Sequence, residues 1–209
     1  VGFLSHLACA FHMSSTLSVF LKPLTEDLAV SRGLFSLLRS GEILIGAAMA
    51  PLVGPLVDRY GGRWLMAGGA VIVGAGFMLL SQVGSFWQFL ALRWTFITIG
   101  GVLMCHMVVS VTISRWFVRR RGRAIAIASL GQGFSKVCIP PLTALLFVWL
   151  GWRGTWSVFG LITLILIVIP ALIFMRRSPE DIGLKPDGEA LDENLPAAGA
   201  TQQAKVAIA

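Results

Sequence analysis

The chain holds 209 residues, of which 56% are hydrophobic and only 13% charged, with a formal net charge of +7 and a mean hydropathy of +0.81. Soluble domains contain about 45–50% apolar and about 25% charged residues, so this chain has too little polar surface for a water-soluble globule. The composition also excludes disorder, which requires low hydrophobicity and high net charge. The apolar residues lie in blocks that approach the ~20 residues needed to cross a bilayer, so the sequence predicts a multi-pass membrane protein.

Six apolar segments follow one another along the chain, and each is predicted to span the membrane. They lie at residues 2–21, 33–57, 64–83, 86–114, 124–150 and 155–175. We expect helices, because barrel strands would instead show segments of about ten residues with alternating polarity. The chain opens at Val1 already inside an apolar run, so we expect its natural start to lie upstream.

Basic residues in the loops predict the orientation of these segments. Ten follow the second, fourth and sixth segments: Arg59, Arg63, Arg115, Arg119, Arg120, Arg121, Arg123, Arg176, Arg177 and Lys185. The opposite side holds three: Lys22, Arg32 and Arg153. Cytoplasmic loops carry the excess of Lys and Arg, so the even-numbered segments are expected to end on the cytoplasmic side. The membrane is expected to be a plasma or inner membrane. The basic excess is therefore assigned to membrane orientation and not to nucleic-acid binding. Trp87, Trp149, Trp152 and Trp156 fall at predicted outer ends, where indole rings prefer to lie.

The composition changes after Arg177. Residues 178–209 hold six acidic residues and almost no large apolar ones, which predicts a solvated cytoplasmic linker or tail. Residues 1–177 are expected to form one transmembrane bundle. A polar linker after six segments is where a second bundle would attach.

The loop between the second and third segments carries the most specific pattern. It reads Gly-Pro-Leu-Val-Asp-Arg-Tyr-Gly-Gly-Arg, from Gly54 to Arg63. Its glycines permit tight turns, and an ordinary cytoplasmic turn is the alternative interpretation. The spacing resembles the loop signature of the major facilitator superfamily of secondary transporters. That resemblance implies a charge network that locks the outward-facing state. The matching positions are Gly54, Asp58, Arg59, Gly61 and Arg63, with Arg115 as a partner from the end of the fourth segment.

Other stretches are similar to the monocarboxylate-type and oxalate/formate-type branch of that superfamily. They are Val19 to Leu24 followed by Ser31-Arg32, Arg115-Trp116-Phe117 followed by Arg121 to Ala124, Pro140-Pro141 ahead of Gly151-Trp152-Arg153, and Pro179 to Gly188. The resemblance covers most of residues 1–188. It implies an all-α membrane protein whose six transmembrane helices form the N-terminal half of a major facilitator fold, a 3+3 inverted repeat.

The chain departs from this pattern in three ways. Animal monocarboxylate carriers have a lysine in the first helix where this chain has Ser15, so their lysine relay is not carried over. The fourth-helix glycines that follow Arg93 come late, at Gly100 and Gly101. Such carriers also have twelve spans. A second six-helix bundle is therefore an expected partner, either as a missing C-terminal half or as a homodimer mate.

Polar residues inside the segments mark candidate sites, because ionisable groups in hydrocarbon usually face a bundle interior or a wet cavity. Lys136 is predicted near the midplane, about 18 Å along the fifth segment. It shares a helix face with Ser129 and Gln132, and Pro140 continues that face. The first segment has a similar stripe of Ser5, His12, Ser15 and Thr16. Both stripes are expected to line the solute path, and the alternative is hydrogen bonding between helices.

The remaining polar residues have structural interpretations as well as functional ones. Arg39 and Glu42 are three apart and are expected to pair on one helix. Arg93 is interpreted either as a substrate or proton site or as an interhelical salt bridge, and His106 as a packing residue. Cys9, Cys105 and Cys138 are expected to be small buried apolar residues and not a disulfide or metal set. Glycines of the third and fourth segments are expected at helix contacts: Gly68, Gly69, Gly74, Gly76, Gly100 and Gly101.

These patterns together predict secondary active transport, by symport or antiport, of a small organic anion such as a monocarboxylate. Alternating access moves the solute, Lys136 and Arg93 contact it, and Ser15, His12 and Gln132 complete its site. His12 or Glu42 would titrate if protons are coupled. Enzyme motifs are absent from the sequence, and no cofactor or metal is expected. The alternatives are a drug or cation exporter of the same superfamily and a six-span protein that transports nothing.

Overall fold

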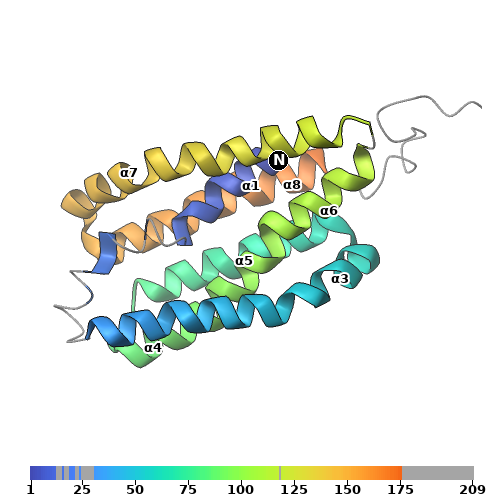
Figure 1. The fold of residues 1–209 in the computed structure, drawn as a ribbon. Coiled ribbons are helices and arrows are strands. Elements are labelled where there is room, and N and C mark those ends of the chain that lie inside the picture. Colours follow the sequence, from blue (N-terminus) through green and yellow to red (C-terminus); the bar gives the residue numbers. More distant parts are fainter. Residues whose placement is uncertain (13–15, 17–18, 22–23, 25–30, 118, 176–209) are drawn as a thin grey trace, which may run out of the picture.

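The computed structural model describes residues 1–12, 16, 19–21, 24, 31–117 and 119–175, and these residues contain helices and turns but no strand (Figure 1). The elements, in chain order, are α1 (Gly2–Cys9), the 3₁₀ turn η1 (Ala10–His12), α3 (Arg32–Leu80), α4 (Phe86–Leu92), the π-helix η2 (Arg93–Thr98), α5 (Ile99–Met104), α6 (His106–Trp116), α7 (Arg121–Thr163), the π-helix η3 (Leu164–Val168) and α8 (Ile169–Phe174). The predicted polar linker, residues 178–209, lies outside the described residues.

Two of these helices fold back on themselves at a glycine. A straight helix of 49 residues, the length of α3, would be about 70 Å long, more than twice the hydrocarbon thickness. Instead α3 turns at Gly61 (φ 78°) and α7 turns at Gly151 (φ 65°), a conformation that glycine adopts without steric cost. The ribbon reverses direction within both helices (Figure 1). Both turns fall in predicted loops, between residues 57 and 64 and between residues 150 and 155.

Three helical stretches of the described chain are long and apolar enough to cross a membrane: Gly33–Leu80, Phe86–Ser114 and Arg121–Phe174. Serine caps mark where two of them begin. The Ser31 hydroxyl accepts a hydrogen bond from the Leu34 amide (3.3 Å), and the Ser85 hydroxyl accepts one from the Gln88 amide (3.4 Å). The Gln88 side chain in turn accepts from the Gly84 amide (3.3 Å). These bonds satisfy first-turn amides that have no partner within the helix.

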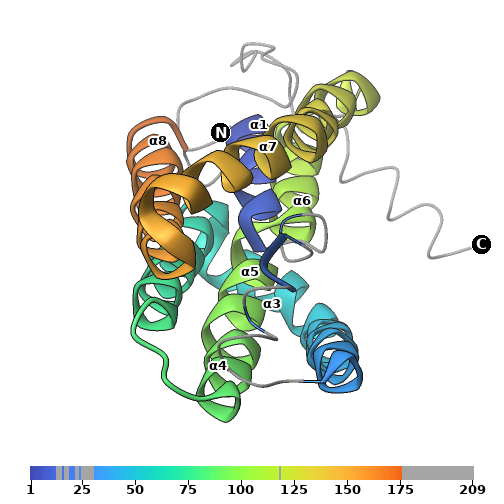
Figure 2. The ribbon, with the colours of Figure 1, turned by 90° about the vertical axis from the view of Figure 1, so that its left-hand side faces the viewer.

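Figure 2 views the helices roughly end-on, with α1 and the α4–α6 stretch in the middle. The first half of α3 and the first half of α7 flank α1 and the α4–α6 stretch on one side. The second halves of α3 and α7, with α8, lie on the other side.

Close contacts between helices depend on glycines, as predicted for several of them. A Cβ on Gly69 would lie 2.7 Å from the carbonyl oxygen of Gly100, and a Cβ on Gly100 would lie 2.8 Å from that of Gly69. Gly74 and Gly76 meet neighbouring side chains just as closely, whereas a Cβ on Gly68 would meet nothing within 4 Å. The bare backbones of α3 and α5 therefore touch, as small residues allow between membrane helices.

Trp156 corrects the expectation that it lies at the membrane interface. It is fully buried and stacks on Phe20 (centroids 4.2 Å apart) and Phe77 (5.3 Å). Trp87 and Trp149 are exposed, at 66% and 79%. The tight turn at Gly151 places the beginning of the second half of α7, which includes Trp156, against the core. Hydropathy alone does not reveal this placement.

Candidate functional site

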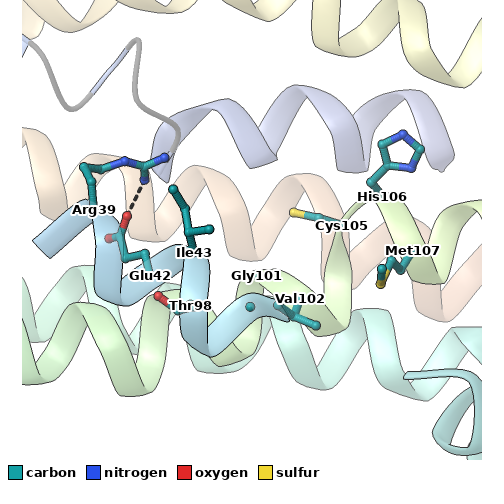
Figure 3. Close-up of a pocket in the computed structure, with 10 residues that line it drawn as sticks. Arg39, Glu42, Ile43, Thr98, Gly101, Val102, Cys105, His106 and Met107 are labelled. Carbon is teal, nitrogen blue, oxygen red and sulfur yellow. Dashed lines mark hydrogen bonds and ion pairs between the residues drawn. The ribbon is translucent and has the colours of Figure 1, made fainter. Parts of the chain in front are cut away.

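A cavity of about 320 Å³ lies between the first half of α3 and the α5–α6 stretch (Figure 3). Its wall combines charged and polar side chains with apolar ones, and those of Arg39 and Glu42 converge at one end. The ten lining residues are Arg39, Glu42, Ile43, Gly46, Thr98, Gly101, Val102, Cys105, His106 and Met107. Midplane cavities walled by apolar residues with a few convergent polar groups are where membrane bundles hold ligands.

Glu42 is shared by two arginines. One carboxylate oxygen pairs with Arg39, as the sequence spacing predicted, and the other accepts a hydrogen bond from Arg93 Nε at 2.6 Å. The Arg93 side chain is fully buried and that of Glu42 is 8% exposed, whereas Arg39 is 31% exposed toward the cavity. Two cations around one carboxylate leave an excess of one positive charge beside the cavity.

Local structure places Arg93 at this position. It opens the π-helix η2, and the Thr98 hydroxyl donates to the Arg93 carbonyl (2.9 Å) across the widened turn. The next residue, Trp94, fits against Gly41, where any Cβ would lie 2.2 Å from the indole. The Trp94 indole also donates to the Leu38 carbonyl (3.1 Å). This contact sets the spacing at which Glu42 reaches Arg93.

Aromatic rings surround the rest of the Arg93 guanidinium. Its central carbon lies 5.9 Å from the Trp156 ring centroid and 6.0 Å from that of Phe89. At these distances a ring face attracts a cation. Of the two interpretations left open for Arg93, the structure therefore displays the interhelical salt bridge. Arg93 is not among the residues that line the cavity.

The helical stretch Phe86–Ser114 breaks beside the cavity, at Cys105 (φ −95°, ψ −149°), between α5 and α6. The buried Ser5 hydroxyl of α1 donates to the Met104 carbonyl at this break. For Ser5, the structure thus shows hydrogen bonding between helices, which is the alternative interpretation of the polar stripe in the first segment. Thr16 donates instead to the Ala10 carbonyl (2.6 Å) of its own segment.

Cys9 and Cys105 form a disulfide, which corrects the expectation of three unpaired cysteines. Their Cα atoms lie 6.1 Å apart, although 96 residues separate them in the chain. Cys138 is free. The disulfide depends on α1 crossing the break between α5 and α6, so no sequence spacing could predict it.

His106 is also more than a packing residue. It is exposed at the cavity wall, and its Nδ1 lies 3.1 Å from the Ser110 hydroxyl. Its ring centroid is 5.2 Å from that of His6 on α1, with the planes at 68°. Sequence reasoning missed His6, although an ionisable residue inside an apolar segment was an available signal.

Lys136 is exposed on the first half of α7 and makes no hydrogen bond or ion pair with a described residue. The buried face of this helix consists of Ala128, Gly131, Ser135, Ile139 and Thr143. At 100° per residue, Ser129, Gln132 and Lys136 form the adjoining stripe, where Ser129 and Gln132 are half-buried. The large exposed apolar residues lie on a different face: Ile127, Leu130, Phe134, Val137, Leu145 and Val148. The predicted polar stripe therefore borders the buried face and stays separate from the apolar one.

Two other predicted solute-site residues lie beyond what the structure describes. Ser15 is outside the described residues, and of His12 only the backbone is described, as the end of η1. Gln132 is described, and its carbonyl accepts a hydrogen bond from the Ser135 hydroxyl (2.8 Å).

Comparison with known proteins decides the family. The profile of the Major Facilitator Superfamily matches residues 3–206. The chain belongs to this superfamily. It is thus a multi-pass membrane protein of a transporter family and not an enzyme, as predicted.

Relatives within the superfamily are diverse. The chain is 28% identical over 185 residues to the MFS transporter asaE of Aspergillus flavus, covering 88% of this chain and 42% of that protein. It is 33% identical over 165 residues to monocarboxylate transporter 6 of Mus musculus, covering 75% and 33%. It is 26% identical over 189 residues to the riboflavin transporter RibJ of Trypanosoma brucei brucei, covering 88% and 34%. The chain thus spans between 33% and 42% of the length of these relatives.

The loop that resembles the superfamily signature is a tight turn in the structure. Gly61 provides its positive φ, and Asp58 and Arg59 are exposed beside it. The Arg63 guanidinium lies 5.5 Å from the Trp64 ring centroid. Gly54 lies within the helix, where a Cβ would meet nothing within 4 Å. Arg115 lies near the end of α6, and its side chain is outside the described part, so its expected partnership in the loop stays a prediction.

Proposed function

We propose that this chain is the N-terminal six-helix half of a secondary transporter of the monocarboxylate-type or oxalate/formate-type branch, and that it carries a small organic anion by alternating access. The superfamily match supports transport, and the sequence similarity to monocarboxylate transporter 6 supports the branch. The two helical hairpins, α3 and α7, support six spans, each half of a hairpin crossing once. In this proposal residues 1–177 are the bundle and residues 178–209 a cytoplasmic linker. The second bundle is the missing C-terminal half or a homodimer mate.

The observation that carries the anion assignment is the excess of basic over acidic side chains among Arg39, Glu42, Arg93 and Lys136. Glu42 is matched by both Arg39 and Arg93, and Lys136 adds a cation that no described carboxylate neutralises. An uncompensated cation within a membrane-spanning segment favours an anionic ligand.

Each predicted solute residue takes a role consistent with its place. Lys136 contacts the anion directly, and Gln132, His12 and Ser15 complete the path around it. Arg93 acts from behind Glu42, holding that carboxylate in position so that Arg39 remains at the cavity wall. An arginine fork suits a carboxylate because its N–H groups match two oxygens. The Asp58 loop latches the cytoplasmic side through Arg59, Arg63 and Arg115.

Uptake of radiolabelled pyruvate into vesicles containing the native-length protein tests this function. Lys136→Ala should raise the half-saturating pyruvate concentration by about tenfold, the loss of a charge-assisted hydrogen bond worth ~1.5 kcal/mol, and Lys136→Arg should restore most of it. Thr143→Val, two helical turns further along α7 and on its buried face, is the matched control. Unchanged uptake and affinity in Lys136→Ala would remove Lys136 from the solute site.

The rivals predict different outcomes in the same vesicles. A drug or cation exporter would move cationic dyes and ignore pyruvate. A six-span protein without transport activity would move neither, even at native length.

A further inference from the structure

One wall of the cavity is a single face of α3. It consists of residues at the helical spacing i, i+3, i+4, i+7, namely Arg39, Glu42, Ile43 and Gly46. The opposite wall runs from η2 to α6, and Figure 3 shows its last residues, His106 and Met107, at the far end of the cavity from Arg39. Gly46 lies seven residues after Arg39, so the α3 wall is about 10 Å long.

Positive charge is in excess at the Arg39 end of the cavity. Both carboxylate oxygens of Glu42 are bonded, one to Arg39 and the other to Arg93, so the three side chains together carry one net positive charge. Arg93 is fully buried, whereas the Arg39 side chain is 31% exposed, so a ligand in the cavity meets this charge at Arg39. A guanidinium carries five N–H donors, and the described bond from Arg39 to Glu42 uses Nη1 alone.

The rest of the cavity wall is largely apolar. The side chains of Ile43 and Met107 are 64% and 47% exposed. A Cβ built on Gly46 would meet one described atom outside its own helix within 4 Å, Val102 Cγ2 at 3.9 Å, so the glycine leaves space beside Val102. The volume of about 320 Å³ is roughly twice the ~150 Å³ of an apolar cavity that holds benzene. The cavity therefore has room for an apolar body much larger than the methyl group of pyruvate.

We propose that this cavity binds an amphipathic carboxylate, whose carboxylate group contacts Arg39 and whose apolar body lies along Ile43, Gly46 and Val102. The assignment rests on the proposed transport function for the claim that this acid is carried, but not for its binding. The bound acid brings the charged cluster to two arginines and two carboxylates, which balances its charge. Arg39 thus selects for the carboxylate, and the apolar wall selects for the size of the body.

Other ligand classes fit the cavity less well. A cationic ligand would face the excess positive charge at Arg39, and a neutral apolar ligand would cover that charge without pairing it. A small inorganic anion would leave Ile43 and Met107 exposed. Lys136, which the proposed function places on the solute path, is not among the residues that line this cavity, so the two basic residues are tested separately.

Equilibrium binding to the native-length protein in lipid nanodiscs tests the site without any transport. The probes are radiolabelled 4-phenylbutyrate, its neutral analogue 4-phenylbutyramide, and pyruvate. Each buried methylene tightens binding by about fourfold, so 4-phenylbutyrate should bind about tenfold or more tighter than pyruvate. Equal affinity for the two acids would overturn the proposal, and so would an absence of 4-phenylbutyrate binding because a second bundle occupies the cavity.

Arg39→Gln tests the carboxylate contact. It should weaken 4-phenylbutyrate binding about tenfold more than 4-phenylbutyramide binding, because only the acid loses a charge-assisted hydrogen bond. Arg39→Lys keeps the charge without the planar fork and should recover part of this loss. A purely structural role for Arg39 would weaken the binding of acid and amide equally, and that result would overturn the contact.

Gly46→Leu tests the apolar part of the cavity and keeps the test available if Arg39→Gln fails to fold. The new side chain takes up space beside Val102, so it should weaken 4-phenylbutyrate binding about tenfold more than pyruvate binding. Gly33→Leu is the matched control on the same helix, outside the cavity lining, with the nearest heavy atom 3.8 Å from the new Cβ. An equal effect of Gly46→Leu on both acids would overturn the placement of the apolar body.

Uptake of both acids into vesicles separates this site from the proposed function. Uptake of 4-phenylbutyrate that Arg39→Gln reduces would support both. If neither acid is taken up while the binding pattern holds, the proposed function fails and the binding site stands. If pyruvate is taken up but 4-phenylbutyrate neither binds nor competes with it, the binding site fails and the proposed function stands.

Discussion

Glu42 and Arg93, 51 residues apart in sequence, form a buried ion pair in which Arg93 Nε donates to the carboxylate at 2.6 Å. The pair ties the first half of α3 to the start of η2, and its other carboxylate oxygen holds Arg39 at the cavity wall. Because both partners of the buried pair are removed from water, each depends on the other for compensation of its charge. The position of Arg39 at the cavity wall therefore depends on Glu42, whose two carboxylate oxygens pair with Arg39 and with Arg93.

Glu42→Gln should destabilise the bundle strongly. It leaves the buried Arg93 charge uncompensated, a change that costs about 3–5 kcal/mol for buried pairs, whereas Arg39→Gln removes the more exposed partner and should cost about 1 kcal/mol or less. Thermal unfolding of both variants in the same detergent measures the difference. Equal losses of stability would show that the buried pair is no more important than the exposed one.

Gly41→Ala should disturb the same region without touching a charge. Its Cβ would lie 2.2 Å from the Trp94 ring, so the indole must move and give up its hydrogen bond to the Leu38 carbonyl. Overpacking of this kind costs about 1–3 kcal/mol. Gly33→Ala, where the nearest heavy atom would be 3.8 Å away, is the matched control on the same helix. Similar melting temperatures for the two variants would contradict the tight fit at Trp94.

The two ends of the Glu42 network differ in how far the sequence predicts them. Arg39 and Glu42 are three residues apart, so helix periodicity alone predicts their pairing. The link to Arg93 needs the crossing of α3 with η2, and the π-turn that directs Arg93 inward has no sequence signal of its own. Local patterns determine contacts within one helix, whereas contacts between helices depend on packing angles that hydropathy does not contain.

The same distinction holds elsewhere in the fold. The turns at Gly61 and Gly151 were predictable, because a break in hydropathy coincides with glycines and charges. The neighbourhood of Cys105 was not, because its disulfide and its facing histidines join residues about a hundred positions apart. The candidate solute residues on the first segment remain predictions for another reason, since Ser15 and the His12 side chain lie outside the described part of the chain.

Gly61→Ala should cost about 1–3 kcal/mol, because φ 78° with ψ 154° is a backbone conformation that is essentially restricted to glycine. The turn between the two halves of α3 would then form less readily, and the Asp58 loop beside it would lose its geometry. Gly68→Ala is the control in the same hairpin, with ordinary backbone angles and no atom within 4 Å of the new Cβ. Equal stability of the two variants, measured by thermal unfolding, would contradict a strained turn.

The disulfide between Cys9 and Cys105 makes a prediction that mass spectrometry can check on this region of the native-length protein. Alkylation in denaturant without a reductant should modify Cys138 and leave Cys9 and Cys105 unlabelled, and prior reduction should expose all three. Because the bond joins α1 to the break between α5 and α6, Cys105→Ser should destabilise the bundle by about 2–4 kcal/mol, as the loss of a long-range cross-link does. Cys138→Ser removes a thiol without removing a bond and should unfold at the wild-type temperature. Labelling of all three cysteines before reduction would mean that α1 and α6 are held together by packing and by the Ser5 hydrogen bond alone.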